Sequence, residues 1–472
     1  MGMAAPILVA LLAIPMLIEG MGKERFGLLT IIWMGVGYFS LFDLGLGRAL
    51  TKMVAERLGK NELSDLGPLI WTTFLLLLIL GGVATLVVIA LAVPLLSVLS
   101  VPEAMRDEAL DAFYILGGSL PIVIITSGLI GLLEAYQRFD LITLIRIPLG
   151  ILTFVAPLLT LQYDPSIALA TAALLLSRFF ALGAYYIAVS QVCDELKHPQ
   201  KPQRKLLSGL FRFGGWLTVT NIVSPLMTYL DRFFVGAILG LSSVAYYVTP
   251  YEVLSRLQIL PQAIMGVLFP AMATAHAGEK KRFVDLYAHA RHLVFWLMLP
   301  VTASAFLLAP EALEVWLGED FKDASTTVVQ WLALGWIINA LARPAFTALQ
   351  TAGCPDLVAK SHLAELIPYL VLLWWLSSRY GIAGTAATWT LRVAADTLIL
   401  NLLAAMRLPE LRTQIFRTLG IVASTLVGFA AFWLLDDLLW RLLVLIGISL
   451  LSLMMLWPLL VKAFGTARRL PC

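Results

Sequence analysis

Long runs of apolar residues, separated by short polar segments, cover most of this 472-residue chain. A helix that crosses a bilayer needs about 20 mostly apolar residues. Because the runs are continuously apolar and do not alternate, they indicate membrane-spanning helices and not the strands of a barrel. The pattern predicts about fourteen spans, at residues 4–18, 26–50, 68–93, 113–133, 141–161, 167–190, 214–239, 244–272, 293–308, 328–349, 363–378, 382–406, 418–435 and 442–461. The first run lacks a preceding Lys or Arg and a clear cleavage site, so we interpret it as a membrane helix whose start lacks a few residues, and not as a signal peptide.

The composition favours lipid as the solvent, because 60% of the residues are hydrophobic and 13% are charged. A soluble domain carries about 25% charged residues, so this chain has about half the usual share. The three cysteines, Cys193, Cys354 and Cys472, form no C-x-x-C motif, which argues against a disulfide framework or a zinc ribbon. His289 and His292 have no partner cysteines and no Glu-x-x-His context. We therefore expect neither a metal nor a cofactor.

The basic residues fall mainly on one side of the membrane when the predicted spans alternate in direction. That side carries Arg48, Lys52, Arg57, Lys60, Arg138, Lys197, Lys201, Arg204, Lys205, Arg212, Lys280, Lys281, Arg282, Arg291, Lys360, Arg407, Arg412, Arg417, Lys462, Arg468 and Arg469. The other side carries only Lys23, Arg25, Arg106, Lys322, Arg379 and Arg441, among acidic residues such as Glu103, Asp107 and Glu319. The positive-inside rule predicts that both termini lie in the cytoplasm.

A weak internal repeat predicts two lobes. Leu133-Glu134 with Asp140-Leu141 recurs as Leu349-Gln350 with Asp356-Leu357, and Phe26-Gly27-Leu28 recurs at a similar separation as Ala245-Tyr246-Tyr247. The longest loop, residues 191–213, contains Pro199 and Pro202 and fits a hinge. We therefore predict six-helix lobes at residues 1–203 and 204–406, followed by two additional helices at 407–472. Repeated bundles that flank a midplane site are typical of secondary transporters.

Several enzyme classes find no support in the motifs. The chain has no G-x-x-x-x-G-K-[ST] loop for ATP hydrolysis, no Asp-x-Asp pair for a sugar-nucleotide metal and no apparent Ser/His/Asp set. The longest outward segments, residues 101–111 and 310–325, are short and acidic, which leaves no room for a catalytic domain. We expect a transporter with no catalytic residues, and no nucleic-acid partner.

Charged residues within the predicted spans are the candidate functional residues. Each costs about 2.5–3.5 kcal/mol at a helix centre, so it needs a partner or a water-filled cavity. They are Asp43, Arg146, Arg178, Asp231, Arg232, Glu252, Arg256, Arg343, Glu365, Arg392 and Asp396. Arg146, Arg178, Arg343 and Glu365 lie nearer helix ends or lack an evident partner, and we do not select them.

The spacing of the remaining charges predicts which of them pair. Glu252 and Arg256 are four residues apart, as are Arg392 and Asp396, so each pair shares a helix face and is expected to interact. A purely structural ion pair is the alternative for both. Asp231 and Arg232 are adjacent and point about 100° apart, so we expect one of them to face a lumen.

Asp43 lies in a glycine-rich segment, Phe42-Asp43-Leu44-Gly45-Leu46-Gly47-Arg48. Glycines allow close helix approach or local unwinding beside a carboxylate. The alternative is a helix cap near the cytoplasmic end. Arginine forks match phosphate oxygens, and a carboxylate can carry a coupling ion. We accordingly predict that Arg256, Arg232, Arg48 and Arg392 hold an anionic headgroup, and that Asp43, Asp231, Glu252 and Asp396 serve ion coupling or gating.

Several segments resemble the polysaccharide flippases of the multidrug/oligosaccharidyl-lipid/polysaccharide exporter superfamily. They are Glu24 to Leu28, Phe39 to Thr51 with Ala55-Glu56, Gly131 to Asp140, Tyr229 to Arg232 with Gly236, Tyr246-Tyr247 and Phe269-Pro270. The resemblance covers most of the chain. It implies an all-α integral membrane protein with two lobes around a V-shaped cavity, located in the bacterial inner membrane. Many members of the family have twelve helices, so the last two helices here are an addition.

The resemblance implies that the chain turns an undecaprenyl-diphosphate-linked oligosaccharide from the inner to the outer leaflet for surface polysaccharide synthesis. Alternating access and coupling to an ion gradient are part of that expectation. The partners it implies are the lipid-linked glycan, membrane lipid, a polysaccharide polymerase and glycosyltransferases. Two alternatives stay open: a drug or cation exporter, which would need an acidic cavity, and a membrane enzyme such as a glycan polymerase or ligase.

Overall fold

The computed structural model describes residues 4–39, 43–60, 66–207, 210 and 229–467. Within these residues the chain is helical with short turns and contains no strand, so the predicted all-α class is confirmed. Contacts divide the chain into two compact units, Met1–Val248 and Thr249–Cys472. The predicted division at residues 203 and 406 stays a prediction. Much of the expected span 214–239 and part of the hinge loop 191–213 lie outside the described residues, as does Cys472.

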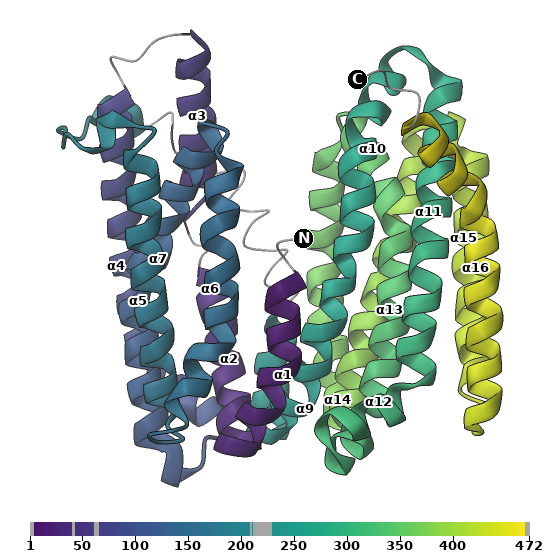
Figure 1. Ribbon diagram of the computed structural model, residues 1–472, viewed down its shortest axis with the longest axis horizontal. Helices are drawn as coiled ribbons and strands as arrows, with labels where there is room; N and C mark the ends of the chain where they lie inside the picture. Colours follow the sequence, from purple (N-terminus) through teal and green to yellow (C-terminus); the bar gives the residue numbers. More distant parts are fainter. Residues whose placement is uncertain (1–3, 40–42, 61–65, 208–209, 211–228, 468–472) are drawn as a thin grey trace. The chain divides into compact units, whose positions relative to one another are not determined.

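The first unit is built around helix α5. Its helices are α1 (Ala4–Met21), α2 (Lys23–Phe39), α3 (Leu46–Lys60), α4 (Leu66–Val98), α5 (Arg106–Ala135), α6 (Phe139–Thr160) and α7 (Ile167–Ser190), followed by a helical segment at 229–239. Helix α5 packs against α3, α4 and α7 (Figure 1). Large apolar side chains on the outer side of α4, such as Leu78 and Leu86, remain exposed, as expected for a surface covered by lipid.

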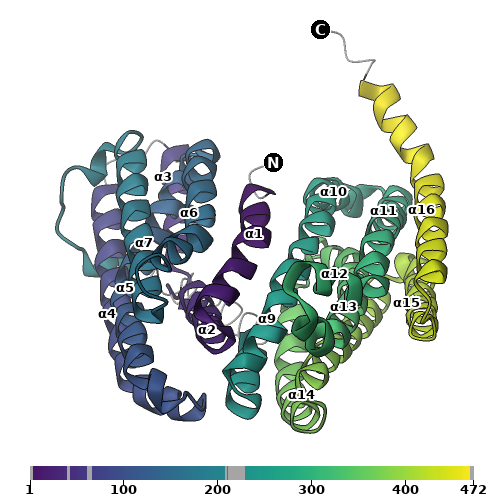
Figure 2. The ribbon, with the colours of Figure 1, turned by 60° about the horizontal axis from the view of Figure 1, so that its bottom comes forward.

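The second unit is built around helix α13. Its helices are α9 (Leu241–Ser255), whose first half belongs to the first unit, α10 (Ile259–Gly278), α11 (Lys280–Leu307), α12 (Ala309–Leu317), α13 (Glu319–Thr351), α14 (Pro355–Arg407), α15 (Arg412–Phe432) and α16 (Leu438–Ala467). Helix α13 packs against α10, α11, α12 and α14 (Figure 2). In the apolar stretch of α13, 83% of the residues are buried, whereas in that of α16 only 11% are. Helix α13 therefore forms the centre of this unit, and α16 lies at its periphery.

The described residues form fifteen α-helices, which fits the prediction of about fourteen spans, although some helices break at other places than expected. Among the described residues ten helices are long and apolar enough to cross a membrane, and α1 is a shorter apolar helix. Helix α14 covers two expected spans, because Gly381 (φ 60°, ψ −144°) folds it into a hairpin. The expected span 26–50 is instead two helices, α2 and α3. The expected span 293–308 belongs to a longer helix that begins at Lys280.

Small and polar residues close the α14 hairpin. A side chain on Gly384 would place its Cβ 2.1 Å from the carbonyl oxygen of Leu376, so only glycine fits there. The hydroxyls of Ser377 and Thr385 lie 2.8 Å apart across the turn. This packing brings the first half of α14 beside its second half, so that side chains far apart in sequence become neighbours.

Candidate functional site

The break between α2 and α3 is organised by the buried carboxylate of Asp43. Its Oδ1 accepts the Gly45 N–H at 2.9 Å, and its Oδ2 accepts the Gly47 N–H at 3.0 Å. Leu44 (φ 52°) and Gly45 (φ 70°) adopt left-handed backbone conformations in the same turn. The local unwinding expected from the glycines is therefore present. The bonds to Gly45 and Gly47 are those of a cap on α3, the alternative given for Asp43 above.

Close helix packing joins this turn to α5. The Ser127 hydroxyl donates to Asp43 Oδ2 at 3.1 Å. A Cβ on Gly131 of α5 would lie 2.7 Å from the Gly47 carbonyl oxygen, and the Thr51 hydroxyl bonds the Gly131 carbonyl at 3.0 Å. Glycine at these positions lets the start of α3 lie directly on α5, which positions the side chains that follow Asp43.

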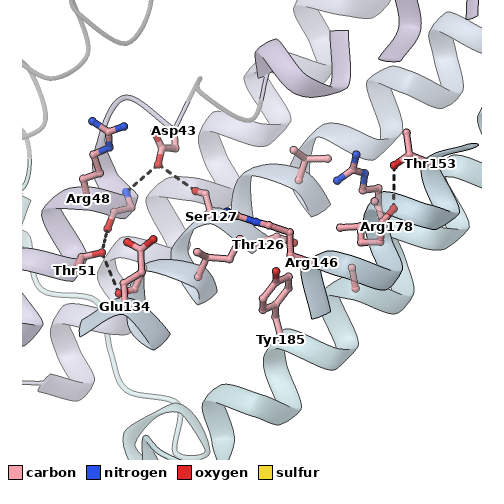
Figure 3. A pocket seen from close by; sticks show the side chains of 17 residues that line it. Asp43, Arg48, Thr51, Thr126, Ser127, Glu134, Arg146, Thr153, Arg178 and Tyr185 are labelled. Carbon is pink, nitrogen blue, oxygen red and sulfur yellow. Dashed lines mark hydrogen bonds between the residues drawn. The ribbon is translucent and has the colours of Figure 1, made fainter. Parts of the chain in front are cut away.

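A cavity of about 420 Å³ opens beside this packing, within the first unit. Helices α3, α5, α6 and α7 all contribute to its walls (Figure 3). Its charged side chains are Arg48, Arg146, Arg178, Asp43 and Glu134, and its other polar side chains include Thr51, Thr126, Ser127, Thr153 and Tyr185. The cavity therefore combines three guanidinium groups with two carboxylates and several hydroxyls.

The three guanidinium groups are available to an anion. Among the described residues, no carboxylate lies within 4.0 Å of the guanidinium nitrogens of Arg48, Arg146 or Arg178. The carboxylate of Asp43, in contrast, is already engaged by two backbone N–H groups and Ser127. Guanidinium groups bind phosphate oxygens in bidentate fashion, and do so more strongly where water is scarce. The cavity is suited to hold a phosphate or diphosphate, with hydroxyls nearby for neutral polar groups.

Of the four arginines selected from the sequence, only Arg48 lines this cavity. The sequence prediction does not include Arg146 and Arg178, because they lie nearer the predicted helix ends or lack an evident partner. The packing of α6 against α7 brings both to the cavity, where the buried Tyr185 interacts electrostatically with each of them. The sequence did contain one indication of their role. Two arginines within predicted spans are costly to insert, and no partner nearby in the sequence offsets that cost.

Asp231 and Arg232 are both buried in the first unit. The Tyr247 hydroxyl donates to Asp231 Oδ2 at 2.6 Å, and the Arg232 backbone N–H donates to Asp231 Oδ1 at 2.8 Å. The Arg232 guanidinium lies 5.2 Å from the centre of the Tyr229 ring. That one of the two charged side chains faces a lumen stays a prediction, because residues 211–228 lie outside the described part.

Glu252 and Arg256 pair as the sequence predicted. Arg256 Nη2 lies 3.4 Å from Glu252 Oε2, one helical turn away. Both side chains are partly exposed, at 42% for Arg256 and 30% for Glu252. Arg256 also begins a short 3₁₀ turn, Arg256–Gln258, between α9 and α10. The pair thus lies where the α-helical hydrogen-bonding pattern gives way to a single 3₁₀ turn.

The predicted pairing of Arg392 with Asp396 is wrong. Asp396 Oδ1 instead faces His362 Nε2 at 3.3 Å, and Arg392 Nη1 lies 4.0 Å from Glu365 Oε2. The Arg392 guanidinium also lies over the Tyr369 ring, 5.6 Å from its centre. The physical reason is the turn at Gly381, because the returning half of α14 offers closer partners than one helical turn does.

These side chains form a charged cluster in the second unit: His362, Glu365, Arg392 and Asp396 of α14, with Arg343 of α13 close enough to Asp396 to interact electrostatically. Glu365 is 7% exposed, and neither of its carboxylate oxygens has a hydrogen-bond partner among the described residues. Glu365 and Arg343 are not among the residues selected from the sequence, because they lie nearer the predicted helix ends or lack an evident partner. In the described part of the chain, no group of three or more His, Cys, Asp or Glu side chains is arranged to hold a metal ion.

Comparison with known proteins places the chain in a family. The family model of the polysaccharide biosynthesis proteins matches residues 21–326. A candidate O-antigen transporter of Shigella flexneri is 31% identical over 402 residues, covering 85% of this chain and 94% of that protein.

Solved structures share the fold. The lipid II flippase MurJ in an inward closed conformation matches with a TM-score of 0.72 at 13% identity, over 97% of both chains. An inward-facing multidrug resistance transporter of the MATE family matches with a TM-score of 0.70 at 16% identity, over 86% of this chain and 96% of that one. The chain therefore belongs to the polysaccharide biosynthesis protein family, as its resemblance to the polysaccharide flippases of the multidrug/oligosaccharidyl-lipid/polysaccharide exporter superfamily had indicated.

Proposed function

We propose that this protein flips an undecaprenyl-diphosphate-linked oligosaccharide from the inner to the outer leaflet of the bacterial inner membrane, with both termini in the cytoplasm. Its family, and the O-antigen transport named for its Shigella relative, support a glycan-lipid substrate. The single observation that carries the proposal is the cavity with three arginines that have no carboxylate partner within 4.0 Å among the described residues.

The diphosphate is the difficult part of such a substrate to move. An isolated charge in an apolar medium costs tens of kcal/mol, so a carrier must replace the water around the phosphate oxygens. Arg48, Arg146 and Arg178 come from three different helices and can supply guanidinium groups to a diphosphate from several directions. The hydroxyls of Thr51, Thr126 and Thr153 donate to backbone carbonyls, and their oxygens can accept hydrogen bonds from the hydroxyls of the first sugars. Arg256, Arg232 and Arg392 stay proposed as further anion contacts.

We further propose that a coupling ion acts through carboxylates, with the cluster around Glu365 and Asp396 as the leading site. Glu365 and Asp396 are both buried and close enough to interact electrostatically, and a proton bound by either one would relieve the repulsion between two carboxylates. The nearby cations Arg392 and Arg343 disfavour a metal cation at the same place. The proposed ion is therefore a proton. Asp43, Asp231 and Glu252 remain secondary candidates for coupling or gating.

The two alternatives fit less well. A drug or cation exporter needs a cavity with net negative charge, whereas this cavity holds three guanidinium groups and two carboxylates. A glycan polymerase or ligase would be recognised by its phenotype. Loss of a polymerase leaves single lipid-linked repeat units on the outer side of the membrane, whereas loss of a flippase keeps them on the inner side. A polysaccharide polymerase and glycosyltransferases are proposed as partners in the same pathway.

The function is tested in a strain that lacks this chain and makes a surface glycan. The strain is complemented with the wild type, Arg146→Gln, Arg178→Gln, or the control Arg407→Gln, which changes an exposed arginine at the end of α14. We expect the cavity variants to lose surface glycan and to accumulate lipid-linked repeat units in the cytoplasmic leaflet, at normal protein level. Normal glycan display by both cavity variants would overturn the proposal, as would accumulation of the units outside.

A further inference from the structure

A second recess of the first unit is nearly all apolar and opens on the outer side of the bundle. It has a volume of about 550 Å³. Its walls come from α4, α5, α7 and the loop after α7, and they include Trp71, Leu78, Phe179, Gly183, Tyr186 and Gln200. We call it the α4–α7 groove. Phe179 is 60% exposed and Tyr186 47%, so the groove presents aromatic surface outward.

The loop after α7 closes one end of the groove and is held firmly there. The Trp71 indole N–H donates to the Glu195 carbonyl at 3.3 Å, and the Gln203 backbone N–H donates to the Thr72 hydroxyl at 2.9 Å. A Cβ on Gly67 would lie 2.4 Å from the side chain of Gln200, so the loop packs directly on the start of α4. The closed end is therefore part of the fold of this unit.

The closed end carries positive charge. Lys197 is neutralised by Asp194 at 2.6 Å, but Lys201, Arg204 and Lys205 have no ion pair among the described residues. Lys201 lies in sequence between Gln200 and Pro202, both of which line the groove. An apolar groove that ends at exposed basic residues is complementary to a lipid with an anionic headgroup.

The groove covers about two thirds of the thickness of one leaflet. Trp71 and Leu78 are seven residues apart on α4, which is about 10 Å at 1.5 Å per residue. One leaflet contributes about half of a hydrocarbon core roughly 30 Å thick. The basic residues at the closed end indicate a lipid from the leaflet on the same side as this loop, and the length of the groove fits within that leaflet.

We infer that the α4–α7 groove is a binding site for an anionic glycerophospholipid, with an acyl chain along α4 and α7 and the phosphate at Lys201 and Arg204. This site is separate from the three-arginine cavity, and it does not depend on the proposed flippase activity. The positive-inside rule assigns it to the cytoplasmic leaflet. Its occupant is a resident lipid of the membrane, and not the polyprenyl chain of the transported substrate.

Gly183 provides a way to fill the groove without disturbing the fold, because no atom lies within 4 Å of a Cβ built there. Gly183→Leu should therefore occupy the groove itself. Gly82→Leu is the matched control, since Gly82 of α4 also has no atom within 4 Å of its Cβ and does not line the groove. For the headgroup, Lys201→Gln with Arg204→Gln is compared with Lys280→Gln and Lys281→Gln, exposed lysines at the start of α11.

The full-length protein is purified in detergent and titrated with phosphatidylglycerol, phosphatidylcholine or undecaprenyl phosphate, and bound lipid is counted by native mass spectrometry. We expect wild type and both controls to bind phosphatidylglycerol at least about fivefold more tightly than phosphatidylcholine. Gly183→Leu and the Lys201/Arg204 double variant should lose that preference. Equal binding of the two phospholipids by wild type would overturn the inference. So would an unchanged preference in both groove variants, or competition in which undecaprenyl phosphate displaces phosphatidylglycerol at equal concentration.

Discussion

The hydroxyl of Ser127 donates a 3.1 Å hydrogen bond to the carboxylate of Asp43, across 84 residues of sequence. This bond ties the turn between α2 and α3 to α5, at the edge of the three-arginine cavity. Asp43 thus holds backbone and side chain together at the point where the second predicted span breaks. Substitutions of Asp43 can separate its structural role in this turn from any role in ion coupling.

Asp43→Ala removes the cap of α3 and the bond to Ser127, which costs about 0.5–2 kcal/mol for the cap alone. Asp43→Asn keeps one carbonyl acceptor and removes the charge. We expect the apparent melting temperature in detergent to fall for both variants and furthest for Asp43→Ala, because the amide nitrogen of Asp43→Asn would face one of the N–H donors of Gly45 and Gly47. If Asp43→Asn is present at normal protein level and loses more transport than Asp43→Ala, the charge has a role beyond the cap. If Asp43→Ala melts unchanged, the capping role is contradicted.

The close contact of α3 with α5 can be tested with one methyl group. Gly131→Ala would place Cβ 2.7 Å from the Gly47 carbonyl oxygen, which belongs to backbone and cannot turn aside. Overpacking of this kind costs about 1–3 kcal/mol. Gly118→Ala, on the same helix and with no atom within 4 Å, is the control. A lower melting temperature is expected for Gly131→Ala only, and equal values for the two variants would refute the contact.

The charged cluster of the second unit predicts an energetic coupling between Glu365 and Arg392 when the proton proposed to be shared by Glu365 and Asp396 resides on Asp396. Removing one member of a buried pair leaves an uncompensated charge and costs about 3–5 kcal/mol, whereas replacing both costs much less. Glu365→Gln, Arg392→Gln and the double variant therefore form a cycle, read from thermal unfolding. The double variant should be more stable than Arg392→Gln alone. If the losses of stability in the two single variants add up to the loss in the double variant, the 4.0 Å contact between Arg392 and Glu365 contributes no interaction energy.

Cys193, in the loop after α7, should react slowly with thiol reagents near neutral pH. Burial raises the pKa of its thiol to about 11, and the carboxylate of Glu195 acts in the same direction. Because only the thiolate is nucleophilic, a raised pKa keeps the group protonated and unreactive until the pH approaches that value. In a Cys472→Ser background, alkylation of Cys193 should rise about tenfold per pH unit from pH 7 to 10. Cys354, which is less buried, should react faster at pH 7, and the reverse order would contradict this account.

The sequence predicted the parts of this fold that depend on local chemistry. Apolar runs located the spans, and the four-residue spacing of Glu252 and Arg256 predicted their contact. It failed where packing between distant segments decides. Arg392 lies near Glu365 because α14 folds back at Gly381. A regular helical spacing in the sequence does not predict such a turn. Arg146 and Arg178 likewise meet only through the packing of α6 on α7, so the cavity could not be assembled from the sequence.

Binding of a diphosphate headgroup by the guanidinium groups of the first unit is the step on which the proposed transport depends. The most direct measurement is the flipping of an undecaprenyl-diphosphate-linked oligosaccharide in proteoliposomes that contain wild type, Arg146→Gln with Arg178→Gln, or Arg407→Gln. A hydrogen bond to a charged group contributes about 1.5–3 kcal/mol, so losing both arginines should slow flipping at least about 100-fold, while the Arg407 control retains the wild-type rate. A double variant that flips as fast as the wild type would contradict the central claim.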